Sequence, residues 1–338
     1  MDLADALRAV TGGATLDRDG ARAVFAGALA EDTDPVLFGG FLAALATRGE
    51  TAEEIAGAAA ALRGAAEPFE HPFPEAIDTC GTGGDGLGTF NLSTAAAVVA
   101  AAAGAKVVKH GNRSVSSRCG SADLLEHAGV ALDLDPAAGR AVLEEVGITF
   151  LFAPRYHPAM RFAAPVRGSL GVRTVFNFLG PLANPGRVRR QLLGVGDAAR
   201  VEDFARALDE LGTERALVVH GAGGADELTL AGSNRAVGVG DLRAGPFDAE
   251  PLGLAPAPVE ALAGGDAAEN VALLGRLLDG EGGPLRDAVL LNAAAALVVA
   301  GVASEAADGV ARAAESIDSG AARGTFAAWV DATRGAAR

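Results

Sequence analysis

The first 68 residues of the chain are predicted to form helices only. Asp34-Pro35 marks one helix start, because the aspartate can accept hydrogen bonds from the free N–H groups of the first turn and proline suits the first helical position. Thr51 and Glu54 have the spacing of a capping box ahead of an alanine-rich helix. Three prolines within 67–74 then interrupt the pattern and predict a linker.

After the linker, short apolar runs alternate with longer helical segments. The predicted strands are a short run ending at Asp78 and the segments 106–109, 148–152, 191–195 and 216–220. The predicted helices are 93–103, one that begins after Asp135-Pro136, 199–211, 267–279, 285–302 and 304–317. This alternation indicates an α/β fold with a central, mostly parallel sheet covered by helices. Ligands of such sheets bind at the carboxyl ends of the strands.

The composition supports a large buried core, since 50% of the 338 residues are hydrophobic and only 21% are charged. A net charge of −15 argues against nucleic acid as the main partner, because phosphate backbones require a basic surface. A small phosphorylated ligand stays compatible, because a few local cations and N–H groups can bind it.

The cysteines and the apolar runs predict a soluble cytoplasmic protein. Cys80 and Cys119 lack CxxC spacing, which fits a reducing compartment, although a disulfide between them stays an alternative. The first residues carry acids and no basic stretch, unlike a secretory signal. The apolar runs 95–105 and 293–302 are too short to cross a bilayer, so we expect no membrane partner.

A glycine-rich loop after the first predicted strand is the strongest candidate for binding an anion. Five glycines between positions 81 and 88 let the backbone approach a ligand closely and point N–H groups at it. Asn91, Ser93 and Thr94 then open a helix, whose N-terminus favours phosphate. The spacing fits neither a Walker loop nor a dinucleotide fingerprint. A plain surface turn with a helix cap is the alternative, but the position after a strand favours anion binding.

A basic segment, 109–117, ends the next strand. Lys109 and Arg113 supply positive charge and the serines supply small donors, so the segment could hold a second phosphate. A solvated basic turn is the alternative, which is less favoured in so acidic a chain.

Two further segments are ambiguous when taken alone. Asp226 and Glu227 follow a strand and a run of glycines, and neighbouring carboxylates there could hold Mg²⁺. A solvated acidic turn explains them equally well. In the segment 153–185, His157 could be a core histidine and Arg167 half of a surface ion pair. Zinc is not expected, because the histidines and cysteines lack ligand spacing.

These segments, in this order, resemble the anthranilate phosphoribosyltransferase family, within a class that also holds pyrimidine nucleoside phosphorylases. GTGGDG at 81–86 and KHGNR at 109–113 carry the resemblance. HPAM at 157–160, PVR at 165–167 and RTVFNFLGPLANP at 173–185 narrow it to this family. The likeness runs over almost the whole chain. One departure is Gly168-Ser169, where the family commonly has a charged residue after the PVR motif.

The resemblance implies a division of the chain into two domains. Residues 1–68, joined by an insertion near 163–188, would form a small helical domain. Residues 74–162 and 189–338 would form a large α/β domain that binds phosphoribosyl diphosphate. The family also implies a homodimer joined through the helical parts.

The resemblance also assigns site residues. Those that match the phosphoribosyl diphosphate site are Gly81, Gly84, Asp85, Thr89, Asn91, Leu92, Ser93, Thr94, Lys109, His110, Gly111, Asn112, Arg113, Ser114, Val115, Ser116, Ser117 and Ser121. Those that match magnesium ligands are Ser93, Asp226 and Glu227. Gly81, Asn112 and Arg167 match anthranilate contacts, and His110 and His157 match residues along its approach.

The implied reaction moves the phosphoribosyl group of 5-phosphoribosyl 1-diphosphate to the amine of anthranilate, in tryptophan biosynthesis, with two Mg²⁺ ions. We expect positioning and charge stabilisation to dominate and no catalytic base, because the aromatic amine is already neutral. A nucleoside phosphorylase of the same fold is the nearest alternative, and magnesium dependence would separate the two. A non-catalytic sensing protein is a more distant alternative. It is less favoured because binding alone does not require the carboxylate pair.

Overall fold

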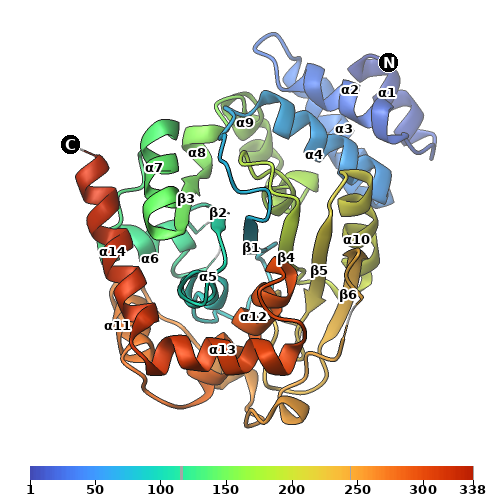
Figure 1. Ribbon diagram of the computed structural model, residues 1–338. Helices are drawn as coiled ribbons and strands as arrows, with labels where there is room; N and C mark the ends of the chain where they lie inside the picture. The colour runs from blue at the N-terminus through green and yellow to red at the C-terminus, as the bar shows by residue number, and fades with distance from the viewer. Residues whose placement is uncertain (115–116, 244, 338) are drawn as a thin grey trace.

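The computed structural model describes residues 1–114, 117–243 and 245–337, and it contains a six-stranded sheet flanked by helices (Figure 1). The strand order is β3-β2-β1-β4-β5-β6, with every pair parallel except the antiparallel pair β5–β6. The strands are β1 (Ile77–Gly81), β2 (Val107–Gly111), β3 (Ile148–Phe152), β4 (Arg190–Gly194), β5 (Arg215–His220) and β6 (Arg235–Gly240). The expected mostly parallel α/β sheet is confirmed.

Fourteen α-helices surround the sheet within the described residues. They are α1 (Leu3–Thr11), α2 (Arg18–Ala28), α3 (Pro35–Arg48), α4 (Ala52–Ala65), α5 (Leu92–Ala102), α6 (Ser121–Ala128), α7 (Pro136–Val146), α8 (Ala153–Tyr156), α9 (Met160–Leu170), α10 (Val201–Glu210), α11 (Ala267–Leu278), α12 (Pro284–Ala300), α13 (Ala306–Asp318) and α14 (Ala321–Ala336). Short 3-10 turns η1 (Val175–Asn177), η2 (Gly180–Leu182), η3 (Ala198–Arg200), η4 (Glu250–Leu252) and η5 (Val259–Leu262) join them. None of the helices has both the length and the apolar character that crossing a membrane takes, among the residues described.

The strands are apolar on both faces because helices cover both sides of the sheet. Successive side chains of a strand point to opposite faces, and β5 illustrates this. Leu217 and Val219 belong to the apolar cluster formed with α5, α12 and α14, whereas Ala216 and Val218 join the cluster formed with α10 and the N-terminal helices.

The N-terminal helices α1–α4 lie together at one end of the molecule (Figure 1). The expected helix starts are confirmed: Asp34 accepts hydrogen bonds from the N–H groups of Val36 (2.8 Å) and Leu37 (3.3 Å), and Thr51 and Glu54 form a complete capping box. The apolar cluster that contains the buried residues of these helices also includes Ala163 and Val166 of α9 and several residues between 175 and 183. Part of the 163–188 segment therefore packs with the N-terminal helices.

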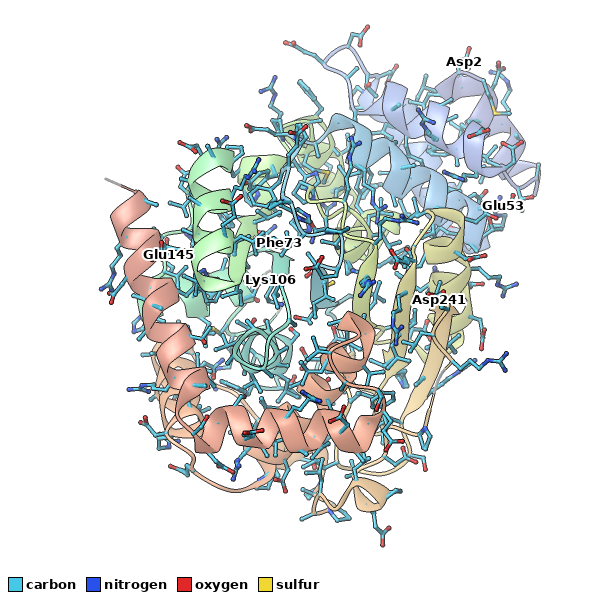
Figure 2. All side chains as sticks on the ribbon, viewed as in Figure 1. Asp2, Glu53, Phe73, Lys106, Glu145 and Asp241 are labelled. Carbon is cyan, nitrogen blue, oxygen red and sulfur yellow. The ribbon has the colours of Figure 1, made fainter. Side chains whose placement is uncertain are left out.

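The predicted linker forms no helix or strand over residues 67–74. Its Phe73 lies against Lys106, whose ammonium is 5.0 Å from the ring centroid; Figure 2 labels both side chains. This cation–π contact, together with the hydrogen bond from Phe69 N–H to Pro185 C=O (3.2 Å), fixes the linker across the start of β2 and the 163–188 segment.

The centre of the molecule is built from alanine-rich helices that approach each other closely. Every residue of α12 from Ala288 to Ala300 is buried. Where α13 crosses it, a Cβ at Gly309 would lie 2.8 Å from the Cα of Ala294, so only glycine fits. Small side chains here let helix backbones touch where larger residues would hold them apart.

Most predicted elements agree with the structure to within one or two residues. The sequence reading missed the edge strand β6 and the helices α6, α8, α9 and α14. Strand β6 contains Gly238 and has only Val239 buried, so it lacks the apolar signal of the other strands. Helix α9 contains Pro165, which argues against a helix interior in a sequence.

Candidate active site

The site lies at the carboxyl ends of the central strands, where the backbone of Asp226 crosses the ends of β1 and β4. Gly81 and Gly194 are paired across these strands. A Cβ at Gly81 would clash with Asp226 Oδ2, and one at Gly194 would clash with the Asp226 carbonyl oxygen. Both positions therefore require glycine, and together they make room for the acidic turn above the sheet.

The glycine-rich loop between β1 and α5 adopts a backbone that side chains would strain. Gly83, Gly84, Gly86 and Gly88 have φ values of 68°, 77°, 76° and 64°. Gly83 N–H donates to Asp226 Oδ2 at 2.6 Å, so one loop amide already holds a carboxylate. The Gly84 carbonyl accepts a hydrogen bond from Arg173 Nη1 at 3.0 Å.

The N-terminus of α5 faces the same turn. Its first residue after the cap, Leu92, is buried, and Ser93 N–H donates to Glu227 Oε1 at 2.9 Å. Asn91 makes no side-chain cap, so an acid from another element satisfies the helix end. The free N–H groups of this helix end therefore point at the acidic turn, where an acceptor is needed.

Asp226 and Glu227 form a half-buried acidic pair with raised pKa values. Burial and the neighbouring carboxylate of Asp85 raise the pKa of Asp226 to about 7. Burial and Asp226 raise the pKa of Glu227 to about 8. Glu227 Oε2 is buried and has no hydrogen-bond partner among the described residues. Paired carboxyl groups that resist ionisation mark a functional site more often than a structural one.

Lys109 is the one buried lysine among the residues described, and it lies beside this pair. Its side chain is 2% exposed, donates to the carbonyl of Thr79 and lies 3.5 Å from Ser93 Oγ. Beneath it, the fully buried Asp78 accepts hydrogen bonds from Asn184 Nδ2 (2.8 Å) and His110 N–H (3.2 Å). Burial raises the pKa of Asp78, and Lys109 opposes that rise.

The segment after β2 wraps around the N-terminus of α6. Asp123 of α6 accepts from the N–H groups of Ser114 and Gly120, both at 2.9 Å. Arg113 pairs with Glu126 at 2.6 Å, and Ser121 Oγ donates to the Asn112 carbonyl at 3.3 Å. The predicted phosphate contact Arg113 is therefore paired with acids of α6 in this structure. Val115 and Ser116 lie outside the described residues.

His110 and His157 face each other, with ring centroids 5.1 Å apart. Burial lowers the pKa of His110 to about 3 and that of His157 to about 4, so both rings are neutral at neutral pH. His110 Nδ1 lies 3.1 Å from the Gly180 carbonyl oxygen. Together the rings form an uncharged, aromatic wall.

Arg167 comes from α9, on the side of the N-terminal helices. It is half-buried, its guanidinium lies 5.5 Å from the ring centroid of Phe176, and it forms no ion pair with any described residue. Burial lowers its pKa. No hydrogen bond or ion pair joins Arg167 to Asn112 or Gly81 in the described part of the chain, whereas the carboxylate pair is hydrogen-bonded to Gly83 and Ser93.

The remaining predicted residues fall around the same centre. They are Asp85, Thr89, Thr94, Gly111 and Ser117, which lie on the glycine loop, on α5, at the end of β2 and on the loop before α6. Sequence reading missed Asp78 and Arg173 as parts of the site. A lone aspartate inside an apolar strand was the available signal for Asp78, whereas Arg173 gave none beyond its motif.

The described residues hold no cluster of three or more His, Cys, Asp or Glu side chains placed to bind a metal. The predicted metal ligands, Asp226, Glu227 and the hydroxyl of Ser93, supply two carboxyl groups and one hydroxyl. A small oxygen-ligand set of this kind suits Mg²⁺, which usually keeps waters and phosphate oxygens as its other ligands.

Two family models place the chain in a class of glycosyl-transferring enzymes with an α/β domain and a helical domain. A family model described as "Glycosyl transferase family, a/b domain" matches residues 73–323. A second model, "Glycosyl transferase family, helical bundle domain", matches residues 4–66. The two matches meet at the proline-rich linker.

The chain belongs to the anthranilate phosphoribosyltransferase family. It is 49% identical over 342 residues to the anthranilate phosphoribosyltransferase of Roseiflexus sp. (strain RS-1), covering 99% of each chain. Its structure is similar to that of the Thermus thermophilus enzyme, with a TM-score of 0.93, 49% identity and coverage of 98% and 99% of the two chains. It is also similar to the Saccharomyces cerevisiae enzyme in complex with PRPP and Mg, with a TM-score of 0.90, 27% identity and 98% of each chain covered.

Proposed function

We propose that this protein transfers the phosphoribosyl group from 5-phosphoribosyl 1-diphosphate to the amine of anthranilate, giving N-(5-phosphoribosyl)anthranilate and diphosphate, in tryptophan biosynthesis. The proposal rests mainly on the acidic pair, which is hydrogen-bonded to both elements suited to bind phosphate, the glycine-rich loop and the N-terminus of α5. Asp226 holds Gly83 of the glycine loop, and Glu227 holds Ser93 at the start of α5. A diphosphate and its cation would enter where these two contacts now meet.

Asp226, Glu227 and the Ser93 hydroxyl fit a magnesium ion. Glu227 Oε2 is buried and has no hydrogen-bond partner among the described residues, and burial raises the pKa values of both carboxyl groups, so a cation here would stabilise their ionised forms. When bound, Mg²⁺ supplies charge neutralisation for the departing diphosphate. We propose two Mg²⁺ ions, the number that the resemblance to the family implies. Gly83 N–H, released from Asp226, is then free to donate to a phosphate oxygen.

The phosphoribosyl group is proposed to lie between the glycine loop and the segment that follows β2. Lys109 supplies fixed positive charge next to Ser93. Arg113, Ser114, Ser117 and Ser121 would hold the ribose phosphate, which requires Arg113 to exchange its contacts with Glu126 for the ligand. Thr89, Asn91 and Asn112 complete the proposed set.

Anthranilate is proposed to bind on the side of His110 and His157, with its carboxylate on Arg167. The neutral histidine pair suits an aromatic ring, and Arg167 is a half-buried cation without an ion-pair partner among the described residues. The amine is neutral before reaction, so it needs no base to attack the ribose carbon as the C1–O bond to diphosphate breaks. The proton that it loses after the N–C1 bond forms passes to the departing diphosphate or to solvent. Asn112 and Gly81 would set the ring position, so rate enhancement comes from alignment and charge.

The proposed domain division assigns 1–68 with 163–188 to the helical part and 74–162 with 189–338 to the α/β part. The shared apolar packing of α9 with α3 supports it. A homodimer through the helical part and a cytoplasmic location stay predictions, and sedimentation of the purified protein would test the first.

The deciding experiment follows the loss of anthranilate fluorescence after mixing purified protein with anthranilate and phosphoribosyl diphosphate. We expect turnover only when Mg²⁺ is present. A parallel reaction supplies a pyrimidine nucleoside and inorganic phosphate without magnesium. Nucleoside cleavage there, together with no loss of anthranilate emission in the first reaction, would assign the chain to the phosphorylases instead.

A further inference from the structure

Asn91 sits between the two segments proposed to bind phosphoribosyl diphosphate, and its side chain is fixed on both sides. It does not cap α5. Its Nδ2 donates to the Cys119 carbonyl at 3.1 Å, which ties the start of α5 to the loop before α6. Its Oδ1 accepts from Asn270 Nδ2 at 2.9 Å.

Asn270 lies in the first turn of α11 and is only 1% exposed. Its Oδ1 accepts a hydrogen bond from Gly265 N–H at 2.7 Å. The four groups form a directed chain: Gly265 N–H donates to Asn270, Asn270 donates to Asn91, and Asn91 donates to Cys119. Each amide accepts on one side and donates on the other, so the orientation of each depends on the one before it.

The segment ahead of α11 also holds the far end of the glycine loop. Phe90 N–H donates to the Leu262 carbonyl at 2.8 Å, and Gly264 N–H donates to the Gly88 carbonyl at 2.9 Å. A Cβ at Gly264 would lie 2.8 Å from the Cα of Phe90, so the two backbones approach too closely for a side chain there. The loop is thus anchored on the same element that carries Asn270.

We infer that Asn270 is a positioning residue of the phosphoribosyl diphosphate site, which acts through Asn91 to fix the glycine loop and the loop before α6 relative to each other. The inference rests on the proposed function. Under this inference, the segment 262–270, which takes no part in the reaction itself, affects the affinity for phosphoribosyl diphosphate and not the affinity for anthranilate. A second link between these elements, the Arg118–Glu269 ion pair at 3.1 Å, is exposed on both sides and contributes little.

The sharpest variant is Asn270→Asp, which replaces the donating NH₂ by an oxygen of nearly the same size. It can still accept from Gly265 N–H, but it has no N–H to offer to Asn91. If Asn91 rotates to donate to the new carboxylate, its own oxygen turns towards the Cys119 carbonyl and that contact is lost. We expect the KM for phosphoribosyl diphosphate to rise roughly tenfold, the loss expected from one buried hydrogen bond, with the anthranilate KM changed less than about twofold.

A double-mutant cycle separates positioning from general damage. The variants are Asn270→Asp, Asn91→Ala and both together. If Asn270 acts through Asn91, the Asn270 substitution has little further effect on the phosphoribosyl diphosphate KM once Asn91 is removed. Fully additive effects, or an equal rise in both KM values, would overturn the inference. Should Asn270→Asp fail to fold, Asn270→Ala carries the same cycle.

Thr333→Val is the matched control. Thr333 Oγ accepts from Ala131 N–H at 3.2 Å, and the residue is 2% exposed on α14, away from the site. Losing this bond should lower the melting temperature and leave both KM values unchanged.

The failure of the proposed function and the failure of this inference give different results. A wild-type protein whose activity does not depend on phosphoribosyl diphosphate would refute the proposed function. An active enzyme whose Asn270 variant keeps the native KM for phosphoribosyl diphosphate would refute this inference alone.

Discussion

The two sides of the site differ in how their polar groups are satisfied. On the carboxylate side, Asp226 is bonded to Gly83 and Glu227 to Ser93, so all four residues already have a partner within the set. On the histidine side, formed by His110, His157 and Arg167, the rings are neutral and the cation has no ion-pair partner among the described residues. The carboxylate side must therefore exchange hydrogen-bond partners when it binds a ligand, whereas Arg167 on the histidine side has no ion pair within the described residues to give up.

This difference predicts different kinetic consequences. Changes on the carboxylate side should alter magnesium use and turnover, because those groups meet the charge that develops during reaction. Changes on the histidine side should alter mainly the affinity for the aromatic substrate. The following experiments test that contrast, beginning with the largest effect.

Replacing Glu227 by glutamine should lower kcat by about 100-fold or more, the size seen when a charge-stabilising group is removed from an active site. The neutral amide keeps the shape but lacks the negative charge, so it binds Mg²⁺ more weakly than a carboxylate. Turnover is measured by anthranilate fluorescence over a range of Mg²⁺ concentrations. Glu281→Gln, which removes only the surface contact with Arg276 (3.2 Å), is the control. Near-normal turnover of Glu227→Gln at ordinary magnesium would contradict the assignment.

Replacing Arg167 by alanine should raise the anthranilate KM by roughly 10- to 100-fold, because a charge-assisted hydrogen bond contributes about 1.5–3 kcal/mol. The KM for phosphoribosyl diphosphate should change little. Arg161→Ala on the same helix is the control, since Arg161 is exposed and stacks only on Phe162 (4.6 Å). Equal weakening for both substrates would remove the distinction between the two sides.

Replacing Gly194 by alanine should destabilise the fold by about 1–3 kcal/mol, the usual cost of overpacking. The new methyl group would meet the Asp226 carbonyl oxygen and displace the acidic turn. Gly196→Ala, two residues on, meets its nearest atom at 3.4 Å and should have a smaller effect. Thermal melting compares the two, and equal melting temperatures would show that the turn can move freely.

The carboxylate side should make the magnesium-free protein less stable at alkaline pH. The pKa of Glu227 is raised to about 8 in the folded state, so its stabilising effect is fully present below about pH 4.5 and is lost as pH rises through about 8. Melting temperatures without Mg²⁺ should therefore decline over this range more steeply for the native protein than for Glu227→Gln. If the melting temperatures of the two proteins changed with pH in parallel, the pKa of Glu227 would lie near its ordinary value.

The histidine side should show the opposite sign, with the smallest effect. The pKa of His157 is lowered to about 4, so its contribution is present above about pH 6.5 and is lost as pH falls towards 4. His157→Gln should reduce the loss of melting temperature between pH 7 and pH 5. An unchanged acid profile would mean that His157 titrates normally.

The sequence anticipated what depends on neighbours along the chain. Caps such as Asp34 and Thr51, the strand before the glycine loop and the loop itself follow from local spacing, and the structure has them. The motif resemblance supplied the residue roles, which stay proposals. Local spacing alone left Asp226 and Glu227 ambiguous, because the contacts that distinguish them come from Gly83 and Ser93, more than 130 residues away.

What the sequence could not supply were long-range polar partners. Asp78 is bonded to Asn184, 106 residues further on, and Asn270 to Asn91, 179 residues back. No spacing rule links such pairs, so neither partner could be assigned from the sequence. The Arg113–Glu126 pairing was likewise invisible, because helix α6 was not anticipated.

The close crossing of α12 and α13 has a consequence for how the enzyme can move. With bare backbone against backbone at Gly309 and Ala294, there is no layer of flexible side chains to slide or compress. The crossing is therefore stiff, and we expect substrates to enter without any separation of α12 and α13.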